Sequence, residues 1–98
     1  MTFPLNGTLV LAGAGKMGGA MLAGWLERGL SPQHVTVVDP APPPEVAALL
    51  ARHAIATIGK AKPLPSPPAV IVAAVKPQIM EAVLPGLALM AGPETLLL

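Results

Sequence analysis

The sequence of 98 residues contains no cysteine, and only 11% of its residues are charged. The absence of cysteine excludes disulfide bonds, thiolate catalysis and cysteine-ligated metal sites. The formal net charge of +1 gives no electrostatic basis for binding nucleic acid or a membrane surface. The two histidines do not cluster: we expect His34 in a loop and His53 at a helix end, both solvated, and we predict no metal site.

Long hydrophobic runs are also missing, although 53% of the residues are hydrophobic. The longest strictly apolar run, Ala69 to Val75, is far shorter than the roughly 20 residues that a membrane-spanning helix needs. No lysine or arginine precedes Lys16, so the N-terminal segment lacks the basic start of a signal peptide. We therefore expect a cytoplasmic protein with no membrane partner.

High hydrophobicity with little charge is typical of a folded chain, and the length corresponds to one domain. Its strand-like segments are unbroken apolar runs, which is typical of strands buried on both faces of a parallel sheet. The sequence ends on a strand-like run, residues 95–98, with no turn or cap after it. We expect these residues to be the front part of a longer protein.

Strand-like and helix-like segments alternate along the chain. The predicted strands cover residues 8–12, 35–38, 54–58, 69–75 and 95–98. The predicted helices cover residues 17–28, 45–52, 78–84 and 87–91, with a break at Pro85 and Gly86, and a proline-rich loop covers residues 59–68. This alternation predicts an α/β fold with right-handed crossovers, a Rossmann-type doubly wound parallel sheet truncated to about five strands in the order 3-2-1-4-5.

The first helix has an apolar stripe at helical spacing, which we expect to face the core. The stripe consists of Met17, Ala20, Met21, Gly24 and Trp25. Gly29 is placed to end the helix. Glycines inside a helix, such as Gly19 and Gly24, each cost about 1 kcal/mol relative to alanine. Their presence predicts that the backbone there closely approaches another part of the structure.

Gly13, Gly15 and Gly18 have the G-x-G-x-x-G spacing, after a predicted strand and at the start of a predicted helix. In a dinucleotide-binding turn, the first glycine permits the tight turn, the second admits a pyrophosphate and the third allows close packing of helix on strand. Backbone N–H groups at the helix start then hold the phosphates. The alternative is that the glycines serve packing alone. The predicted phosphate-binding residues are Gly13, Ala14, Gly15, Lys16, Met17 and Gly18; Lys16 is equally compatible with a solvated side chain.

Asp39 follows the third glycine by roughly 20 residues, at the end of the second predicted strand. A carboxylate there can accept hydrogen bonds from the adenosine ribose hydroxyls and repels a 2′-phosphate. We therefore place Asp39 and Pro40 in the predicted cofactor site. The alternative is an aspartate that only forms the turn before Pro40.

Ala74, Val75, Lys76 and Pro77 follow the fourth predicted strand. Ligands of doubly wound sheets bind at the carboxyl edge where the strand order reverses, which is beside the first strand. We therefore expect the backbone of these four residues to line the nicotinamide side, although Pro77 is also an ordinary residue for opening a helix. No pair of acids and no Ser/His/Asp arrangement lies near these loops, so we predict no catalytic acid or base.

The segments LAGAGKMGGAMLAGW, Leu11 to Trp25, and AAVKPQ, Ala73 to Gln78, together resemble pyrroline-5-carboxylate reductase. The resemblance extends over essentially the whole chain. It implies an N-terminal cofactor domain, residues 1–98, of an oxidoreductase that uses NAD(P)H to reduce 1-pyrroline-5-carboxylate to L-proline in proline biosynthesis. It implies cofactor contacts at the glycine turn, at Asp39 and Pro40, and from Ala74 to Pro77.

The sequence departs from this family in two respects. Family members often carry Ser, Asn or Arg at the positions of Asp39 and Pro40, which suits NADP; Asp39 favours NAD or weak discrimination. The family also has a C-terminal helical domain that forms the dimer and supplies much of the substrate site. The resemblance therefore implies a homo-oligomeric full-length protein. Because that domain is missing here, the 98-residue chain should bind cofactor without turning over substrate.

Two other hypotheses remain open. One is the cofactor domain of a related reductase, such as a β-hydroxyacid dehydrogenase or a deazaflavin-dependent NADP reductase, in which the VKPQ run would not be expected. The other is a stand-alone dinucleotide-sensing module. A gene that ends at Leu98 would favour the sensing module, and a gene that continues into a helical half would exclude it.

Overall fold

The computed structural model of the chain describes residues 7–60, 68–93 and 95–97. Strands and helices alternate in it as predicted. Their bounds are β1 (Leu9–Ala12), α1 (Lys16–Glu27), the 3₁₀ helix η1 (Pro32–His34), β2 (Val35–Val38), α2 (Pro44–Arg52), β3 (Ala56–Ile58), β4 (Val70–Ala73), α3 (Pro77–Met90) and β5 (Leu96–Leu97). Most of the predicted loop at residues 59–68, and the last residue of the predicted fifth strand, lie outside the described residues.

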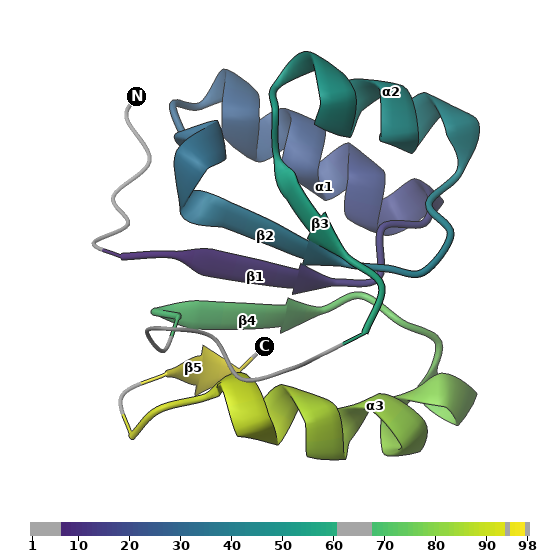
Figure 1. The fold of residues 1–98 in the computed structure, drawn as a ribbon, viewed down its shortest axis with the longest axis vertical. Helices are drawn as coiled ribbons and strands as arrows, with labels where there is room; N and C mark the ends of the chain where they lie inside the picture. The colour runs from purple at the N-terminus through teal and green to yellow at the C-terminus, as the bar shows by residue number, and fades with distance from the viewer. Residues whose placement is uncertain (1–6, 61–67, 94, 98) are drawn as a thin grey trace.

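The strands form one parallel sheet in the order β3-β2-β1-β4-β5. All four residues of β1 pair with both neighbours, so that Leu9 lies between Val35 of β2 and Val70 of β4. The fifth strand is only two residues long and forms two residue pairs with β4. Helices α1 and α2 cover one face of the sheet and α3 covers the other (Figure 1). The predicted Rossmann-type α/β fold is therefore confirmed, and its strand order reverses between β1 and β4.

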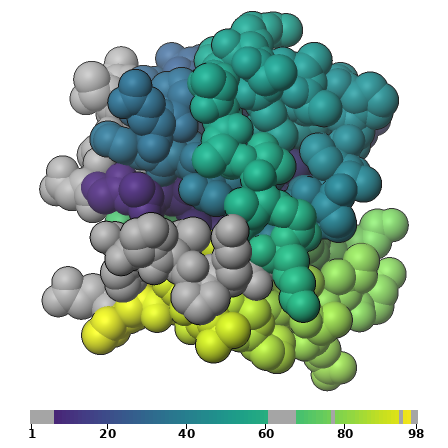
Figure 2. Space-filling view, viewed as in Figure 1, coloured from purple at the N-terminus to yellow at the C-terminus, as the bar shows by residue number. Residues whose placement is uncertain are grey.

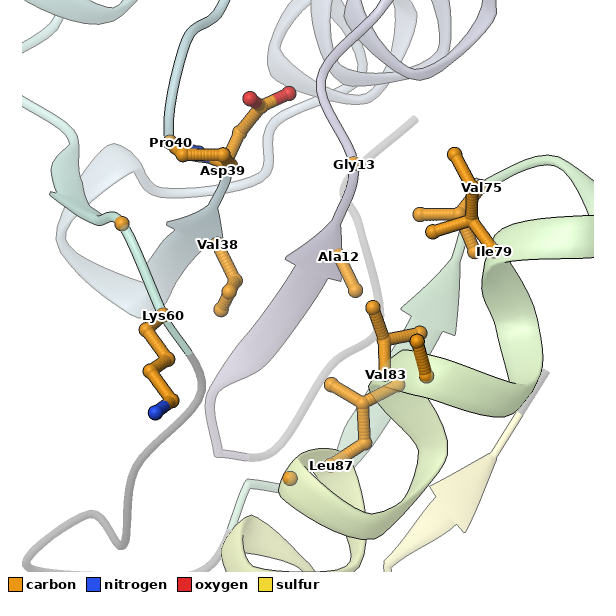
Figure 3. A pocket seen from close by; sticks show the side chains of 13 residues that line it. Ala12, Gly13, Val38, Asp39, Pro40, Lys60, Val75, Ile79, Val83 and Leu87 are labelled. Carbon is orange, nitrogen blue, oxygen red and sulfur yellow. The ribbon is translucent and has the colours of Figure 1, made fainter.

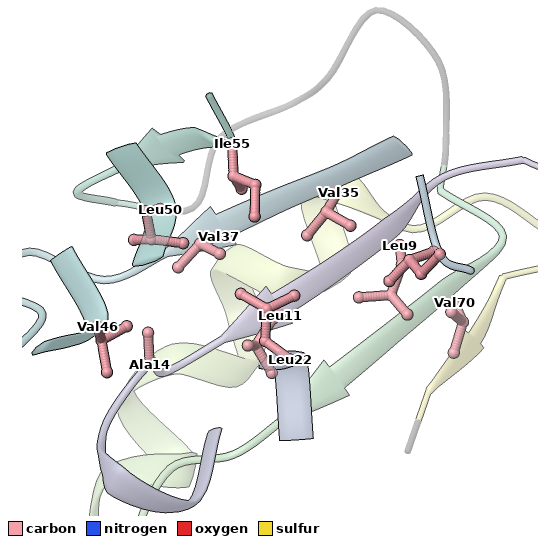
Figure 4. Close-up of a cluster of buried hydrophobic side chains, with 11 residues drawn as sticks. Leu9, Leu11, Ala14, Leu22, Val35, Val37, Val46, Leu50, Ile55 and Val70 are labelled. Carbon is pink, nitrogen blue, oxygen red and sulfur yellow. The ribbon is translucent and has the colours of Figure 1, made fainter. Parts of the chain in front are cut away.

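Alternate residues of the central strands divide the core into two clusters, because successive strand side chains point to opposite faces. Leu9 and Leu11 belong to the cluster under α1 and α2, which Figure 4 shows, and we call this side the α1–α2 face. Val10 and Ala12 belong to a smaller cluster under α3, and we call this side the α3 face. In Figure 2 the side chains of α2 and β3 close over the upper part of the molecule, while those of α3 form its lower part.

Two strand predictions were too long. The fourth strand covers Val70–Ala73 rather than residues 69–75. The third begins at Ala56, because Ala54 adopts a left-handed conformation with φ of 54°. The N–H of Ile55 donates to the carbonyl of Leu50 at 2.9 Å, so residues 54 and 55 complete the C-terminal end of α2 instead of joining the sheet. His53 is the C-cap of α2, at the predicted helix end, whereas His34 ends η1 rather than lying in an irregular loop.

The predicted break at Pro85 and Gly86 is wrong, since α3 is continuous from Pro77 to Met90. Pro85 is exposed, and so is Glu81, whose carbonyl loses its helical N–H donor to the proline. The defect therefore lies on the solvent side of the helix. On the other side, Leu87 and Met90 are buried in the α3-face cluster, and this packing holds the helix together across the proline.

The buried face of α1 is also displaced from its prediction. Met17 is 65% exposed, whereas Gly18, Gly19 and Leu22 are buried; Met21, Trp25 and Leu26 are partly buried against the α1–α2 cluster. The helix ends at the C-cap Arg28, followed by Gly29 with φ of 102°, as a glycine terminator requires. Among the helices of the described residues, none combines the length and the hydropathy that crossing a membrane would demand.

Candidate functional site

The glycine turn is held between the ends of β2 and β4. Gly13 has φ of 91°, and its N–H donates to the carbonyl of Val38 at 2.9 Å. A Cβ atom at Gly13 would lie 2.7 Å from the carbonyl oxygen of Ala74. Both the backbone conformation and the lack of space therefore require glycine at this position, as the predicted tight turn implies.

The three glycines inside α1 differ in what surrounds them. A Cβ atom at Gly18 would collide with the carbonyl oxygen of Gly13, so the helix packs directly on the turn, as predicted. A Cβ atom at Gly19 would lie 2.6 Å from a methyl group of Val46, so here α1 closely approaches α2. At Gly24 a Cβ atom would meet nothing within 4 Å, and the expected close approach is wrong at this position.

Gly15 is the N-cap of α1, and its role differs from that of Gly13. A Cβ atom there would meet nothing within 4 Å, so open space lies in front of this residue. No side chain caps the helix, and no acidic residue occupies its first turn. The first N–H groups of a helix have no partner within it and carry its positive end. With Lys16 and Met17 exposed beside it, this helix start can accept an anionic phosphate group.

Asp39 connects the end of β2 to the glycine turn. Its Oδ2 accepts a hydrogen bond from the N–H of Ala14 at 2.8 Å, and its Oδ1 accepts one from the N–H of Ala41 at 2.8 Å. The Ala41 bond is the local turn that the alternative interpretation of Asp39 describes. The Ala14 bond joins two elements far apart in sequence. A carboxylate has about four acceptor positions, so the half-buried group retains capacity for a ligand hydroxyl.

The segment after β4 borders the same turn. The N–H of Ala74 donates to the carbonyl of Ala12 at 2.7 Å, and a Cβ atom at Gly13 would lie 2.8 Å from a methyl group of Val75. Lys76 is exposed and is the N-cap of α3, which begins at Pro77. Ala74 and Val75 therefore lie against the turn, while Lys76 and Pro77 carry the chain into the helix.

A cavity of about 490 Å³ opens at this carboxyl edge, next to α3 (Figure 3). Its first wall is formed by the ends of β1, β2 and β3, and its second by the end of β4 and by α3. The lining residues are Ala12, Gly13, Val38, Asp39, Pro40, Gly59, Lys60, Val75, Ile79, Ala82, Val83, Gly86 and Leu87. The volume lies in the range of small-molecule sites, and such sites are typically mostly apolar with a few polar groups. The charged side chains in the lining of this cavity are Asp39 and Lys60.

The structure brings only some of the predicted site residues to this cavity. Gly13, Asp39, Pro40 and Val75 line it, Ala14 is hydrogen-bonded to Asp39, and the remaining predicted residues flank it at the two helix starts. The lining residues that the sequence analysis missed are Ala12 and Val38 at the ends of β1 and β2, Gly59 and Lys60 after β3, and five residues of α3. These five have the i, i+3, i+4, i+7, i+8 spacing of one helix face. The predicted break at Pro85 concealed that stripe.

The described residues contain no group of three or more histidine or acidic side chains that could hold a metal ion. A family model described as NADP oxidoreductase, coenzyme F420-dependent, matches residues 8–96 of the chain, from the first strand to the last. No curated protein and no solved structure matches the sequence.

Proposed function

Since the chain belongs to this family of F420-dependent NADP oxidoreductases, we propose that it is the cofactor-binding part of a pyrroline-5-carboxylate reductase. The domain of this family is found in pyrroline-5-carboxylate reductases. The proposed reaction is the reduction of 1-pyrroline-5-carboxylate to L-proline with NAD(P)H. The proposed protein is cytoplasmic and homo-oligomeric, and its partner is the small-molecule substrate.

One observation carries this proposal: the two segments that resemble the reductase form a single edge. The glycine turn follows β1, and the AAVKPQ run begins with Ala73, the last residue of β4. The two segments meet because a Cβ atom at Gly13 would collide with Ala74 and Val75. A generic dinucleotide turn would support only an oxidoreductase. Its contact with the VKPQ segment at the point of strand-order reversal supports the narrower family.

The residues at this edge suit a nicotinamide dinucleotide. We assign the pyrophosphate to the open helix start at Gly15, where N–H groups and the positive end of α1 favour an anion. We assign the adenosine ribose to Asp39, which retains acceptor capacity. The cavity beside it presents Ile79, 45% exposed, as an apolar surface for the adenine base. The nicotinamide end belongs at Ala74 to Pro77.

When bound, the cofactor supplies a hydride for the carbon of the ring imine. The described residues would bind and orient it. We assign no catalytic acid or base among them, because Asp39, the acidic group of the cavity lining, is assigned to the ribose. We therefore expect no reductase activity from the 98-residue chain alone, and we place the substrate-binding groups outside it. Turnover of 1-pyrroline-5-carboxylate by this chain would contradict that assignment.

The test of cofactor binding is calorimetric titration of the chain and of its Gly15→Val variant with NADH and NADPH. The variant should lose binding, because the side chain fills the space intended for the pyrophosphate, and it should keep its fold because nothing lies within 4 Å of the added Cβ. Gly24→Ala, also with open space at the Cβ, is the matched control and should bind as the unmodified chain does. Retained affinity in Gly15→Val would remove the phosphate assignment.

A second candidate is a deazaflavin-dependent NADP reductase, which the description of the matching family favours. The VKPQ run at residues 75–78 argues against it. A longer protein containing this chain distinguishes the two by its substrate. Oxidation of NADPH that depends on 1-pyrroline-5-carboxylate supports the proline-forming reductase, whereas dependence on oxidised coenzyme F420 supports the alternative.

A further inference from the structure

We propose that Lys60 binds the 2′-phosphate of NADPH and thereby admits this cofactor to a site in which Asp39 alone would favour NADH. The inference rests on the proposed function, since it requires a dinucleotide at the carboxyl edge of the sheet. It assigns the recognition of the ribose 2′ substituent to one side chain that follows β3 rather than β2.

The backbone places Lys60 beside the ribose-binding position. Val38 pairs with Ile58 in the parallel register, and the N–H of Asp39 donates to the carbonyl of Ile58 at 2.9 Å. One residue further, a Cβ atom at Gly59 would lie 3.7 Å from the Cα of Pro40. The backbone of Lys60 therefore follows directly after the close approach of Gly59 to Pro40. In Figure 3 Asp39 and Lys60 occupy the same wall of the cavity, opposite Val83 and Leu87 of α3.

The charges of the two residues serve different partners. The Asp39 carboxylate accepts the N–H groups of Ala14 and Ala41, and Figure 3 shows it pointing away from the Lys60 ammonium. Among the described residues Lys60 forms no ion pair and is the only cation of the cavity lining. An exposed ammonium at the rim of an apolar cavity is suited to an anionic ligand group, and lysine is a common phosphate ligand.

The order of the strands indicates which phosphate Lys60 meets. The glycine turn follows β1, Asp39 follows β2 and Lys60 follows β3, and these strands are consecutive neighbours in the sheet. A dinucleotide with its pyrophosphate at the first position and its ribose at the second presents its 2′ substituent toward the third. A pyrophosphate held at the glycine turn would be separated from Lys60 by β2 and Asp39, so the 2′-phosphate would be the anion within reach of Lys60.

The experiment is calorimetric titration of the 98-residue chain and its Lys60→Ala variant with NADPH and NADH, and with 2′,5′-ADP and 5′-AMP as probes of the adenosine half. Lys60→Ala should weaken the binding of NADPH and of 2′,5′-ADP about tenfold. This loss is at the low end for a charge-assisted hydrogen bond, because the Lys60 side chain is exposed. The affinities for NADH and 5′-AMP should change less than about twofold, since these two ligands lack the 2′-phosphate. Lys60→Arg, which keeps the charge, should restore most of the loss.

Arg52→Ala removes another exposed cation, from the last turn of α2 and outside the cavity lining, and should leave the ratio of the NADPH and NADH affinities unchanged. An equal loss of NADH and NADPH in Lys60→Ala, or an unchanged ratio, would overturn the inference while leaving the proposed function in place. If the unmodified chain binds neither dinucleotide, the proposed function fails and the inference fails with it.

Discussion

The two faces of the sheet are built from the same strands, yet they are packed differently. On the α1–α2 face two helices cover the sheet and approach closely enough that Gly19 has no room for a Cβ beside Val46. On the α3 face a single helix covers the sheet, the buried cluster is smaller, and a cavity of about 490 Å³ remains beside the helix. The α1–α2 face also has a smaller cavity, of about 310 Å³, but its lining comes from α2, from residues next to it and from β3, and includes no residue of the glycine turn. Beside the glycine turn, the α1–α2 face is closely packed, whereas the α3 face leaves space.

This difference follows from how many elements cover each face, not from the chemistry of the strands. Leu9 and Leu11 point to one side and Val10 to the other, and all of them are buried. On the α1–α2 face, α1 packs directly on the glycine turn, through the close approach of Gly18 to Gly13. The α3 face then provides room beside that turn. A binding site of this kind needs both a pre-formed backbone turn and a neighbouring volume that the core does not occupy.

The largest effects should come from removing one leucine from each face. Leu22→Ala empties a fully buried position under α1, and we expect a loss of about 4 kcal/mol in the free energy of unfolding. Leu87→Ala, at 2% exposure, should lose only about 2 kcal/mol, because it enlarges an existing open cavity instead of creating a sealed one. Urea denaturation of both variants measures the difference. Equal losses would mean that the two faces are equally well packed.

The α1–α2 face could be predicted from the sequence better than the α3 face, because more of it depends on local patterns. The apolar runs of the central strands and the spacing of Gly13, Gly15 and Gly18 are local patterns, and they predicted the strand order and the turn. Asp39 was predicted as a ligand-binding carboxylate at the end of the second strand. Its hydrogen bond to Ala14 depends on how β1 and β2 are paired, which no local pattern encodes.

The cavity was missed because it depends on a long-range competition. Local propensity breaks a helix at Pro85, but the burial of Leu87 and Met90 against the sheet outweighs that cost. With the helix divided, the stripe from Ile79 to Leu87 did not emerge as one face. Lys60 was missed because its importance comes only from the contact of Gly59 with Pro40.

The continuity of α3 across its proline predicts the next effect. Pro85→Ala restores an N–H that can donate to the carbonyl of Glu81, and it removes the ring that crowds that carbonyl. Because Pro85 is exposed, no packing is lost, and we expect a gain of about 1 to 2 kcal/mol after the added entropy of the unfolded chain. Chemical denaturation measures the gain. A loss of stability would show that the proline ring itself supports the α3 face.

The smallest effect tests how closely α1 and α2 pack on the α1–α2 face, by changes at two glycines of α1. Gly24→Ala, inside α1, adds a methyl group that meets nothing within 4 Å, so it should stabilise the chain by about 0.5 to 1 kcal/mol through helix propensity alone. Gly19→Ala is the matched change in the same helix, and there the methyl group would lie 2.6 Å from Val46 and should destabilise the chain. Thermal denaturation of the two variants compares them directly. Because helix propensity acts alike on both, opposite signs can come only from the close approach of α1 to α2, and equal signs would mean that this approach does not constrain the helix.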